Sequence, residues 1–342
     1  MHSDTFKNKS ILITGGTGSF GQALARRLLE EDECSKVIIF SRDEWKQESM
    51  RQSEPIFNHH KIRYFLGDVR DASRLKRAFN EVQIVVHAAA LKQVPAAEYN
   101  PTEFIKTNII GAMNVIDAAI DNGVEKVIAL STDKSVNPVN LYGATKLCSD
   151  KLFIAGNSYV GARGYPTLSV VRYGNVSGSR GSIIPLWCKL AHDKAEALSI
   201  THPDMTRFWI TLEQSVTFVM NCIAASRGGE IFVPKIPSIR LTDLAKAIAP
   251  EMAIKISGIR PGEKIHELLI SSEESRHTVE IEDHFVIMPE MSNYVTKHLD
   301  RLLNGRKGKR LPEDYCYASN TNIEWLNVAQ LTQLVQPFLD HN

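Results

Sequence analysis

The stretch TGGTGSFG, residues 14–21, decides the fold of this 342-residue chain. It follows the apolar run SILIT and leads into the amphipathic segment FGQALARRLLEE. Gly16, Gly18 and Gly21 fit the pattern G-x-G-x-x-G. Gly15, Gly18 and Gly21 also fit the pattern G-x-x-G-x-x-G. Glycine is needed because a side chain would block the tight turn and the approach of a pyrophosphate to backbone N–H groups. A strand before the pattern and a helix after it are the context that predicts a dinucleotide-binding turn.

Strand-like and helix-like segments alternate through the first half of the chain. Short apolar runs rich in β-branched residues are followed by amphipathic stretches, such as residues 100–121. The runs that we expect to be strands are residues 10–14, 36–40, 62–68, 84–90, 126–131 and 167–176. Near-continuous apolar strands separated by helices predict a parallel sheet that is buried on both faces. With right-handed crossovers, this is a doubly wound α/β domain of the Rossmann type.

The alternation loosens after residue 176 into segments punctuated by proline and glycine, such as SGSRGSIIP and GIRPGEK. We therefore expect residues 1–176 to form the Rossmann domain, which also carries the catalytic residues. Residues 177–290 are expected to be mostly a smaller, partly discontinuous substrate-binding lobe, with room for returns of the chain to the Rossmann sheet. Residues 291–342 receive no role from the sequence.

Bulk composition excludes several classes of function. A formal net charge of +1 argues against nucleic acid or an anionic membrane as the main partner. No apolar run is long enough for a signal peptide or a membrane span, so we expect a cytoplasmic protein. The five cysteines are scattered without a C-x-x-C pair, which indicates neither a disulfide framework nor a metal site.

The end of the second expected strand, IIFSRDEWKQ, bears on the choice of dinucleotide. An NAD site wants a carboxylate there to accept from the ribose 2′-hydroxyl. Here the chain has Ser41 and Arg42, with Lys46 nearby, and these groups suit the 2′-phosphate of NADP. Asp43 leaves room for NAD, and a solvated surface loop would also account for the two cations. We expect NADP.

The segment STDKSVNPVNLYGATK, residues 131–146, concentrates titratable groups between the fifth expected strand and the next helix. Tyr142 and Lys146 are spaced i, i+4, so they share one face of a helix. A tyrosine needs its pKa lowered by about 3 units, or about 4 kcal/mol, to act as a base near pH 7. Lys146 and a positive nicotinamide ring could supply this together. Asp133 and Lys134 form a second pair, which in isolation would be read as an exposed ion pair.

These motifs carry a resemblance to a known family. TGGTGSFG, SRDE, HAAALK, STDK and YGATK are similar to those of the extended short-chain dehydrogenase/reductases that act on nucleotide sugars. More narrowly, the chain resembles the soluble, inverting UDP-N-acetylglucosamine 4,6-dehydratases of pseudaminic acid synthesis, from about residue 9 to at least residue 270. VRYGNVSGSRGSIIP, MTRFWIT and GIRPGEKIHE are the more specific parts. Related membrane-bound dehydratases typically carry methionine at the position of Tyr142.

The resemblance implies roles for individual residues. Tyr142 and Lys146, with Thr132, would serve oxidation at C4 of the sugar, while Lys134 would be the base at C5 and Asp133 the acid for the 6-hydroxyl. Tyr142 is also a candidate for the second proton donor that inversion at C5 requires. The substrate contacts implied are Lys92, Tyr142, Asn175, Arg207, Arg260 and Glu263. The cofactor contacts implied are Gly15, Thr17, Gly18, Ser19, Phe20, Gly21, Ser41, Arg42, Asp43, Lys46, Asp68, Val69, Ala88, Ala89, Ala90, Tyr142, Lys146 and Val176.

Three hypotheses follow. The first is an NADP-dependent inverting dehydratase that acts on UDP-N-acetylglucosamine in the pathway to flagellin glycosylation and assembles, by the same resemblance, as a homo-hexamer. The second is another nucleotide-sugar enzyme of the family, a 4-epimerase or reductase, for which the Asp133–Lys134 pair would be superfluous. The third is a non-catalytic NADP-sensing scaffold, which would have no need of Tyr142 or Lys146.

Overall fold

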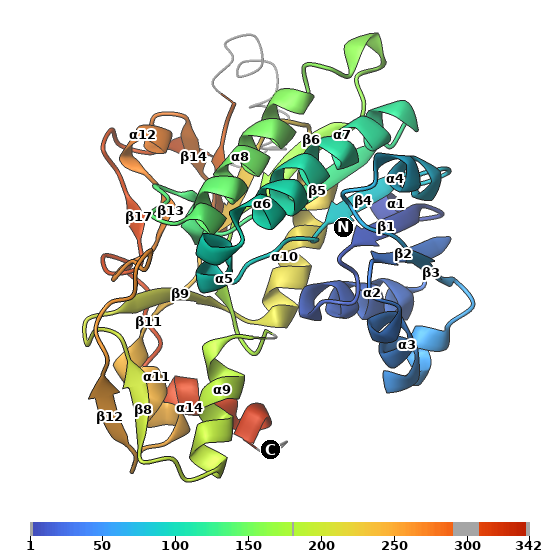
Figure 1. The fold of residues 1–342 in the computed structure, drawn as a ribbon. Helices are drawn as coiled ribbons and strands as arrows, with labels where there is room; N and C mark the ends of the chain where they lie inside the picture. The colour runs from blue at the N-terminus through green and yellow to red at the C-terminus, as the bar shows by residue number, and fades with distance from the viewer. Residues whose placement is uncertain (1–2, 180, 290–307, 340–342) are drawn as a thin grey trace.

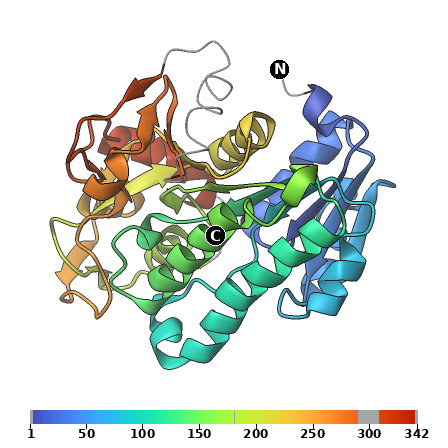
Figure 2. The same cartoon turned by 90° about the horizontal axis from the view of Figure 1, so that it is seen from above.

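One large, mostly parallel sheet forms the centre of the molecule (Figures 1 and 2). The structure, a computed structural model, describes residues 3–179, 181–289 and 308–339. Within these ranges, ten strands pair in the order β16-β14-β15-β10-β6-β5-β4-β1-β2-β3. Their bounds are β1 Ser10–Thr14, β2 Lys36–Ser41, β3 Ile62–Leu66, β4 Ile84–His87, β5 Lys126–Leu130, β6 Thr167–Val171, β10 Ile231–Pro234, β14 Thr278–Glu280, β15 His284–Ile287 and β16 Lys309–Arg310. The strands from β10 to β3 run parallel, and β15, β14 and β16 extend the sheet antiparallel.

Helices cover both faces of this sheet (Figure 2). One layer contains α2, α3 and α10, and the other contains α4, α7 and α8. Their bounds are α2 Ser19–Glu31, α3 Glu44–Ser53, α4 Ala72–Ala78, α7 Gly111–Asp121, α8 Leu141–Gly156 and α10 Leu212–Ala225. The expected doubly wound parallel sheet is thus confirmed. In the described ranges, no helix combines the length and the apolar character needed to cross a membrane.

The shorter helices of this half are α1 Ser3–Phe6, η1 Pro55–Asn58, α5 Val94–Tyr99, α6 Pro101–Phe104, η2 Ile105–Ile110, η3 Asp133–Ser135 and η4 Gly161–Arg163. The segment expected as one helix, residues 100–121, is made of α6, a π-helical turn at η2, and α7. A helical hydrophobic pattern predicts the direction of such a segment, but one inserted residue in its hydrogen-bond ladder leaves no mark in the pattern.

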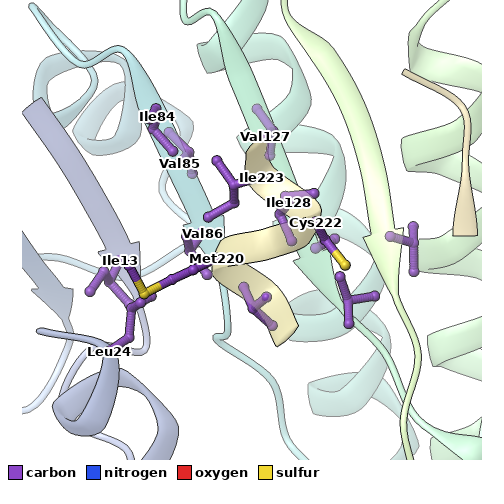
Figure 3. Close-up of a cluster of buried hydrophobic side chains, with 14 of the residues drawn as sticks. Ile13, Leu24, Ile84, Val85, Val86, Val127, Ile128, Met220, Cys222 and Ile223 are labelled. Atoms are coloured by element: carbon purple, nitrogen blue, oxygen red, sulfur yellow. The ribbon is translucent and has the colours of Figure 1, made fainter. Parts of the chain in front are cut away.

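The main core lies between the sheet and its helices, and Figure 3 shows part of it under α10. Met220 and Ile223 of α10 pack with Ile13 of β1, Val86 of β4 and Val127 of β5, and all five side chains are buried. Burying one such side chain stabilises a fold by about 1.5–3 kcal/mol. This packing fixes the strands, and therefore the edge from which the candidate site residues project.

The sixth expected strand, residues 167–176, is not continuous, and this corrects the prediction. β6 ends at Val171, and β7 (Asn175–Val176) pairs with β9 in the second lobe. The backbone N–H of Arg172 still donates to the carbonyl of Phe232 in β10 at 2.9 Å, and its buried guanidinium donates to the carbonyl of Leu269 at 3.0 Å and to Glu274 at 2.9 Å, so the chain leaves the main sheet between Arg172 and Asn175. Strand periodicity shows that a segment is extended but not which sheet it joins.

The second lobe has a core of its own, in which Trp187, Trp209, Leu244, Leu331 and Val335 are buried together. Its elements are β7, α9 Ile183–His192, β8 Ala197–Ile200, β9 Thr206–Ile210, β11 Ser238–Arg240, α11 Leu241–Ile248, β12 Ala253–Ile256 and α14 Val328–Leu339. β13 Leu268–Ile270 pairs with β17 Tyr317–Ala318, and α12 spans Ser272–Ser275.

The C-terminal segment, to which the sequence assigns no role, contributes to both lobes. Its residues 291–307 and 340–342 lie outside the described residues. β16 joins the main sheet beside β14, whereas Leu331 and Val335 of α14 complete the core of the second lobe. The chain also returns to the main sheet at β10, β14 and β15.

His87 is a core histidine, buried at the end of β4 with its Nδ1 atom 2.8 Å from Oγ1 of Thr14. Burial, assisted by the charge of Lys146, lowers its pKa to about 3. Because this group binds a proton near pH 6.5 only when unfolded, the stabilisation is present above pH 6.5 and is lost as the pH falls.

We expect His87 to account for about 2 kcal/mol of the unfolding free energy lost between pH 7 and pH 5. Chemical denaturation at both pH values measures this loss, and His87→Asn, which keeps a polar atom near Thr14, should reduce it. An equal loss in the variant would contradict the assignment.

Candidate active site

A cavity of about 760 Å³ lies where the parallel strands end. Residues that follow β1, β2, β3, β4, β5 and β6 all line it, which is where ligands bind in open α/β sheets. The structure brings together here all of the expected cofactor contacts: Gly15, Thr17, Gly18, Ser19, Phe20, Gly21, Ser41, Arg42, Asp43, Lys46, Asp68, Val69, Ala88, Ala89, Ala90, Tyr142, Lys146 and Val176. Thr132, Asp133, Lys134, Lys92 and Asn175 line the same cavity.

The glycine loop has the geometry that a phosphate cradle needs. Gly15 has a φ of +66°, and a Cβ atom there would lie 2.9 Å from Cα of Ala89. A Cβ at Gly21 would lie 2.6 Å from Cα of Gly16, so α2 packs directly on the loop. Gly18 is the N-cap of α2 and makes no side-chain cap hydrogen bond, and Phe20 and Gly21 of the first turn line the cavity, where the N-terminal end of a helix attracts an anion. These residues therefore fit a bound pyrophosphate.

The acidic groups near the end of β2 are already engaged. The carboxylate of Asp43 accepts from the backbone N–H of Lys46 at 3.0 Å, as the N-cap of α3, and lies 3.3 Å from the ammonium of Lys46. Asp68 pairs with Arg70 at 2.7 Å and lies 3.9 Å from Arg42. The side chain of Arg42 remains about half exposed at the cavity wall. At the end of β2, the cavity wall therefore presents a cation, while the carboxylates of Asp43 and Asp68 are paired.

The two titratable pairs come from two neighbouring elements. Asp133 and Lys134 lie on η3, directly after β5, and Tyr142 and Lys146 lie on α8. Asn140 caps α8 by accepting from the N–H of Gly143 at 2.8 Å, which places Tyr142 in the first turn. The i, i+4 spacing then directs Tyr142 and Lys146 into the same cavity.

Asp150, one turn beyond Lys146, holds residues 131–136 against α8, and these residues are called the catalytic segment below because they contain the candidate pair Asp133 and Lys134. Its buried carboxylate accepts from the hydroxyl of Ser131 at 2.7 Å and from that of Ser135 at 3.1 Å. These two residues flank Thr132, Asp133 and Lys134 on both sides. The segment is thus fixed at each end, which limits how far Lys134 can move relative to Tyr142.

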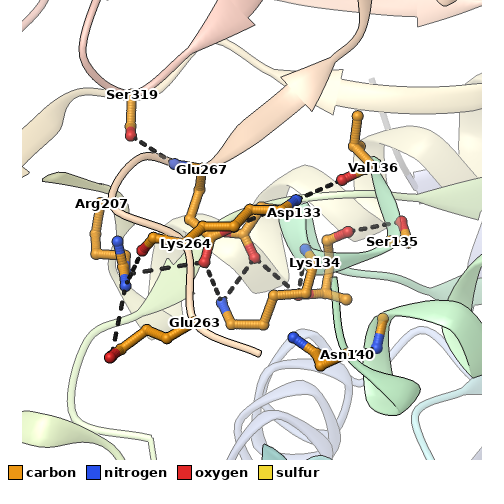
Figure 4. Close-up of polar contacts among 12 residues, drawn as sticks. Asp133, Lys134, Ser135, Val136, Asn140, Arg207, Glu263, Lys264, Glu267 and Ser319 are labelled. Carbon is orange, nitrogen blue, oxygen red and sulfur yellow. Dashed lines mark hydrogen bonds and ion pairs between the residues drawn. The ribbon is translucent and has the colours of Figure 1, made fainter. Parts of the chain in front are cut away.

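Lys134 lies between two carboxylates, as Figure 4 shows. Its ammonium is 3.0 Å from Oδ1 of Asp133 and 3.3 Å from Oε1 of Glu267, and Thr132 donates to the same Asp133 oxygen at 2.9 Å. Burial alone would lower the pKa of Lys134, but the two carboxylates outweigh this effect and raise it above its ordinary value. At neutral pH the Lys134 side chain is therefore an ammonium, and a role as a base would require it to give up this proton first.

Burial also governs the second pair. It raises the pKa of Tyr142 to about 12, against the charge of Lys134 and a hydrogen bond with Thr132. Burial lowers the pKa of the Lys146 ammonium, which nearby Asp150 offsets only in part. The charge of Lys134 thus joins the groups that lower the pKa of Tyr142, and the expected contribution of Lys146 and a nicotinamide ring stays a prediction.

Three expected substrate contacts are not among the residues that line the cavity: Arg207, Arg260 and Glu263. Arg207 is buried, and its guanidinium donates to the carbonyls of Lys264 and Ile265 at 3.0 Å each. It thereby holds the 258–267 loop, to which Arg260 and Glu263 belong, against the catalytic segment. In the same loop, sequence reasoning missed Glu267, because GIRPGEKIHE reads as an exposed polar loop.

Several cavity residues were also not expected from the sequence, among them Tyr173, Gly178, Ser182 and Trp209. They come from the segments after β6 and from β9, where no periodic pattern indicates a site. In the described ranges, no group of three or more His, Cys, Asp or Glu side chains is arranged to hold a metal ion.

Comparison with known proteins places this geometry in a family. The sequence model described as "Polysaccharide biosynthesis protein" matches residues 11–289. The chain is 52% identical over 332 residues to "UDP-N-acetylglucosamine 4,6-dehydratase (inverting)" of Campylobacter jejuni subsp. jejuni serotype O:2, covering 96% of this chain and 98% of that one. It is 42% identical to "UDP-glucose 4-epimerase" of Rickettsia massiliae, covering 96% of each.

A solved structure agrees with these relatives. The X-ray structure of Pen from Bacillus thuringiensis superposes with a TM-score of 0.86 at 34% identity and covers 98% of this chain and 99% of that chain. The likeness therefore extends over both lobes and is not confined to the Rossmann sheet. The resemblance drawn from the motifs is confirmed, and the chain belongs to the polysaccharide biosynthesis protein family of extended short-chain dehydrogenase/reductases.

Proposed function

We propose that this protein is an NADP-dependent, inverting 4,6-dehydratase that converts UDP-N-acetylglucosamine to UDP-2-acetamido-2,6-dideoxy-β-L-arabino-hex-4-ulose. One observation carries the proposal: the Asp133–Lys134 pair and the Tyr142–Lys146 pair line the same cavity as the glycine loop. Oxidation alone needs only the second pair. Loss of water also needs a base and an acid, and the 52% identity to an inverting dehydratase supports that use of the first pair.

Each residue has a task in this reaction. Tyr142, with Lys146 and Thr132 beside it, would take the proton of the 4-hydroxyl once the positive charge of a bound nicotinamide ring has lowered the pKa of Tyr142, and the resulting ketone acidifies the proton at C5. The 3.0 Å contact between Lys134 and Asp133 allows one proton to move from the ammonium to the carboxylate. That single transfer yields the base for C5 and the acid for the departing 6-hydroxyl together. NADP, held by the glycine loop and Arg42, would accept hydride from C4 and return it to C6.

The product formed in deuterated water tests the proposal. Incubation with UDP-N-acetylglucosamine, followed by NMR, should reveal a 4-keto-6-deoxy sugar with the L-arabino configuration. C5 should carry deuterium from the solvent, and the hydrogen originally at C4 should be found at C6. A product that retains the D-configuration at C5, or a C6 hydrogen drawn from solvent, would refute the inverting reaction.

A second candidate function is a 4-epimerase, which the relatives named UDP-glucose 4-epimerase in Rickettsia support. An epimerase would return hydride to C4, release no water and leave C6 unchanged. The same NMR experiment distinguishes the two, because only dehydration creates a C6 methyl group. A non-catalytic NADP-binding scaffold would form neither product. By the resemblance already given, we also propose that the protein is a homo-hexamer and starts pseudaminic acid synthesis.

Arg42→Ala should weaken the binding of NADP at least tenfold and leave that of NAD nearly unchanged. The guanidinium lines the cavity at the end of β2, where it would pair with a 2′-phosphate that NAD lacks. Titration of both cofactors by intrinsic fluorescence measures the two affinities, and extraction of the cofactor from purified protein identifies the one carried. Predominant NAD(H), or equal weakening of both, would contradict the choice of NADP.

A further inference from the structure

The loop of residues 258–267, which follows β12 of the second lobe, contacts the catalytic segment and the N-terminal end of α8. Three contacts dock it there. Asn140 donates to the carbonyl of Gly262 at 2.7 Å. Lys264 donates to the carbonyl of Val136 at 2.6 Å, and Glu267 lies 3.3 Å from the ammonium of Lys134 (Figure 4). Only the last involves a group that the proposed reaction uses. The other two hold the loop in the position from which Glu267 makes its contact.

Glu267 is held rigidly at the end of this loop. Its backbone N–H donates to the hydroxyl of Ser319 at 2.9 Å, and its carbonyl accepts from the N–H of Ser319 at 2.9 Å. Its side chain is only 3% exposed, and its Oε2 atom is buried without a hydrogen-bond partner. A buried carboxylate is costly unless it is paired, so its contact with the Lys134 ammonium is a significant part of its compensation.

The charges around this contact come from four elements. Asp133 and Lys134 lie on η3, Tyr142 on α8, and Arg207 on β9, with Nε 3.9 Å from Glu267. Lys264 of the loop lies 3.9 Å from the other oxygen of Glu267, and Glu263 lies 3.9 Å from Arg207. Burial and the charge of Lys134 both lower the pKa of Lys92. Of the acids in this group, Asp133 and Glu267 contact the Lys134 ammonium.

We propose that Glu267 is a positioning residue for the elimination step: from the second lobe it anchors the Lys134 ammonium opposite Asp133 and sets the pH range in which Lys134 acts as the base. This inference rests on the proposed dehydratase function. Glu267 does not line the cavity, so it acts through Lys134 and not on the sugar. When the proton of the Lys134 ammonium has moved to Asp133, which delivers it to the 6-hydroxyl, Glu267 still holds the Lys134 side chain in position.

The charge of Glu267 should be visible in the pH profile of kcat. A carboxylate at this distance favours the protonated form, so the proton that Lys134 passes to Asp133 is lost to solvent at a higher pH than it otherwise would be, and the falling limb of kcat lies at a higher pH. Glu267→Gln removes the charge and keeps the shape. The falling limb of kcat should move about 1 pH unit lower, and the plateau should fall at least tenfold because Lys134 has lost an anchor. KM for the sugar nucleotide should stay within twofold.

Two further variants separate charge from structure. Glu267→Asp keeps the charge on a shorter side chain, so its falling limb should coincide with that of the wild type while its plateau falls. Glu125→Gln is the matched control: it removes a carboxylate that contacts Lys9 at 2.6 Å, at the opposite ends of the strands. Its profile should be unchanged. Thermal melting of each variant checks folding, and if Glu267→Gln does not fold, Glu267→Asp decides by its limb and plateau.

The outcomes separate the two proposals. If the wild type makes no dehydrated product, the proposed function fails. Suppose that the wild type makes the dehydrated product. The role of Glu267 is then refuted if the kcat–pH profile of Glu267→Gln equals that of the wild type. It is also refuted if the plateau of kcat and the melting temperature of this variant both fall without a shift of the falling limb. A wild-type plateau in Glu267→Asp would refute it as well.

Discussion

Replacing Lys134 with methionine is expected to stop the loss of water while leaving part of the hydride transfer from C4. Lys134 is the one base expected at C5, and loss of a general base typically costs about 10²–10⁴ in rate. The first step should also slow, because the charge of Lys134 lowers the pKa of Tyr142. Stopped-flow absorbance of the reduced nicotinamide should therefore show a slow rise without subsequent decay, and NMR should show no 6-deoxy product.

Tyr142→Phe provides the opposite pattern. It retains the ring, which packs with Ala97 and Phe104, but removes the hydroxyl that takes the 4-hydroxyl proton. The reduced nicotinamide should then fail to accumulate at all. Wild-type turnover in both variants, or identical absorbance traces for the two, would show that the roles are assigned wrongly.

Gly143→Ala is expected to lower kcat by about 10²-fold or more, although the change adds a single methyl group next to Tyr142. A Cβ atom there would overlap the carbonyl oxygen of Lys134 and lie 3.1 Å from Cβ of Pro138. The overlap is with backbone, so it is relieved only if η3 and the first turn of α8 move apart. That movement separates Lys134 from Tyr142, and overpacking of this kind also costs about 1–3 kcal/mol of stability.

Gly164→Ala is the matched control. Gly164 has a φ of +69° and no atom within 4 Å of its added Cβ, so the substitution introduces backbone strain alone. It should destabilise the fold by about 1–2 kcal/mol and leave kcat unchanged. Steady-state kinetics and denaturant unfolding on both variants separate stability from geometry. A Gly143→Ala enzyme with wild-type kcat would contradict the account.

Features that depend on local sequence were predictable. The glycine turn, the strand runs and the i, i+4 pair each follow from the spacing of a few neighbouring residues, and their juxtaposition follows from the common edge of parallel strands. The expected cofactor contacts meet in one cavity for this reason. Their individual roles stay predictions.

Features that depend on distant pairings were not predictable. The contact of Glu267 with Lys134 joins positions that no periodicity relates, and a glutamate in a polar loop carries no signal of burial. Residues 167–176 were expected as one strand because the pattern is extended throughout. The buried Arg172, directly after β6, has its partner Glu274 at a separation of 102 positions, and β7 has its partner strand β9 in the second lobe. In both cases the missing information was the partner.

The repeated passage of the chain between the lobes has a consequence for synthesis. β7 belongs to the second lobe, β10 to the main sheet, β11 and α11 to the second lobe, β14 and β15 to the main sheet, and α14 to the second lobe again. During synthesis, the elements of the two lobes therefore emerge in alternation, and neither lobe can complete its fold before part of the other has been made. Until α14 leaves the ribosome, at about 5–20 residues per second, the parts of α9 and α11 that pack against α14 stay uncovered. The nascent polypeptide thus passes through an incompletely folded stage with exposed apolar surface, to which chaperones can bind, before the cavity is complete.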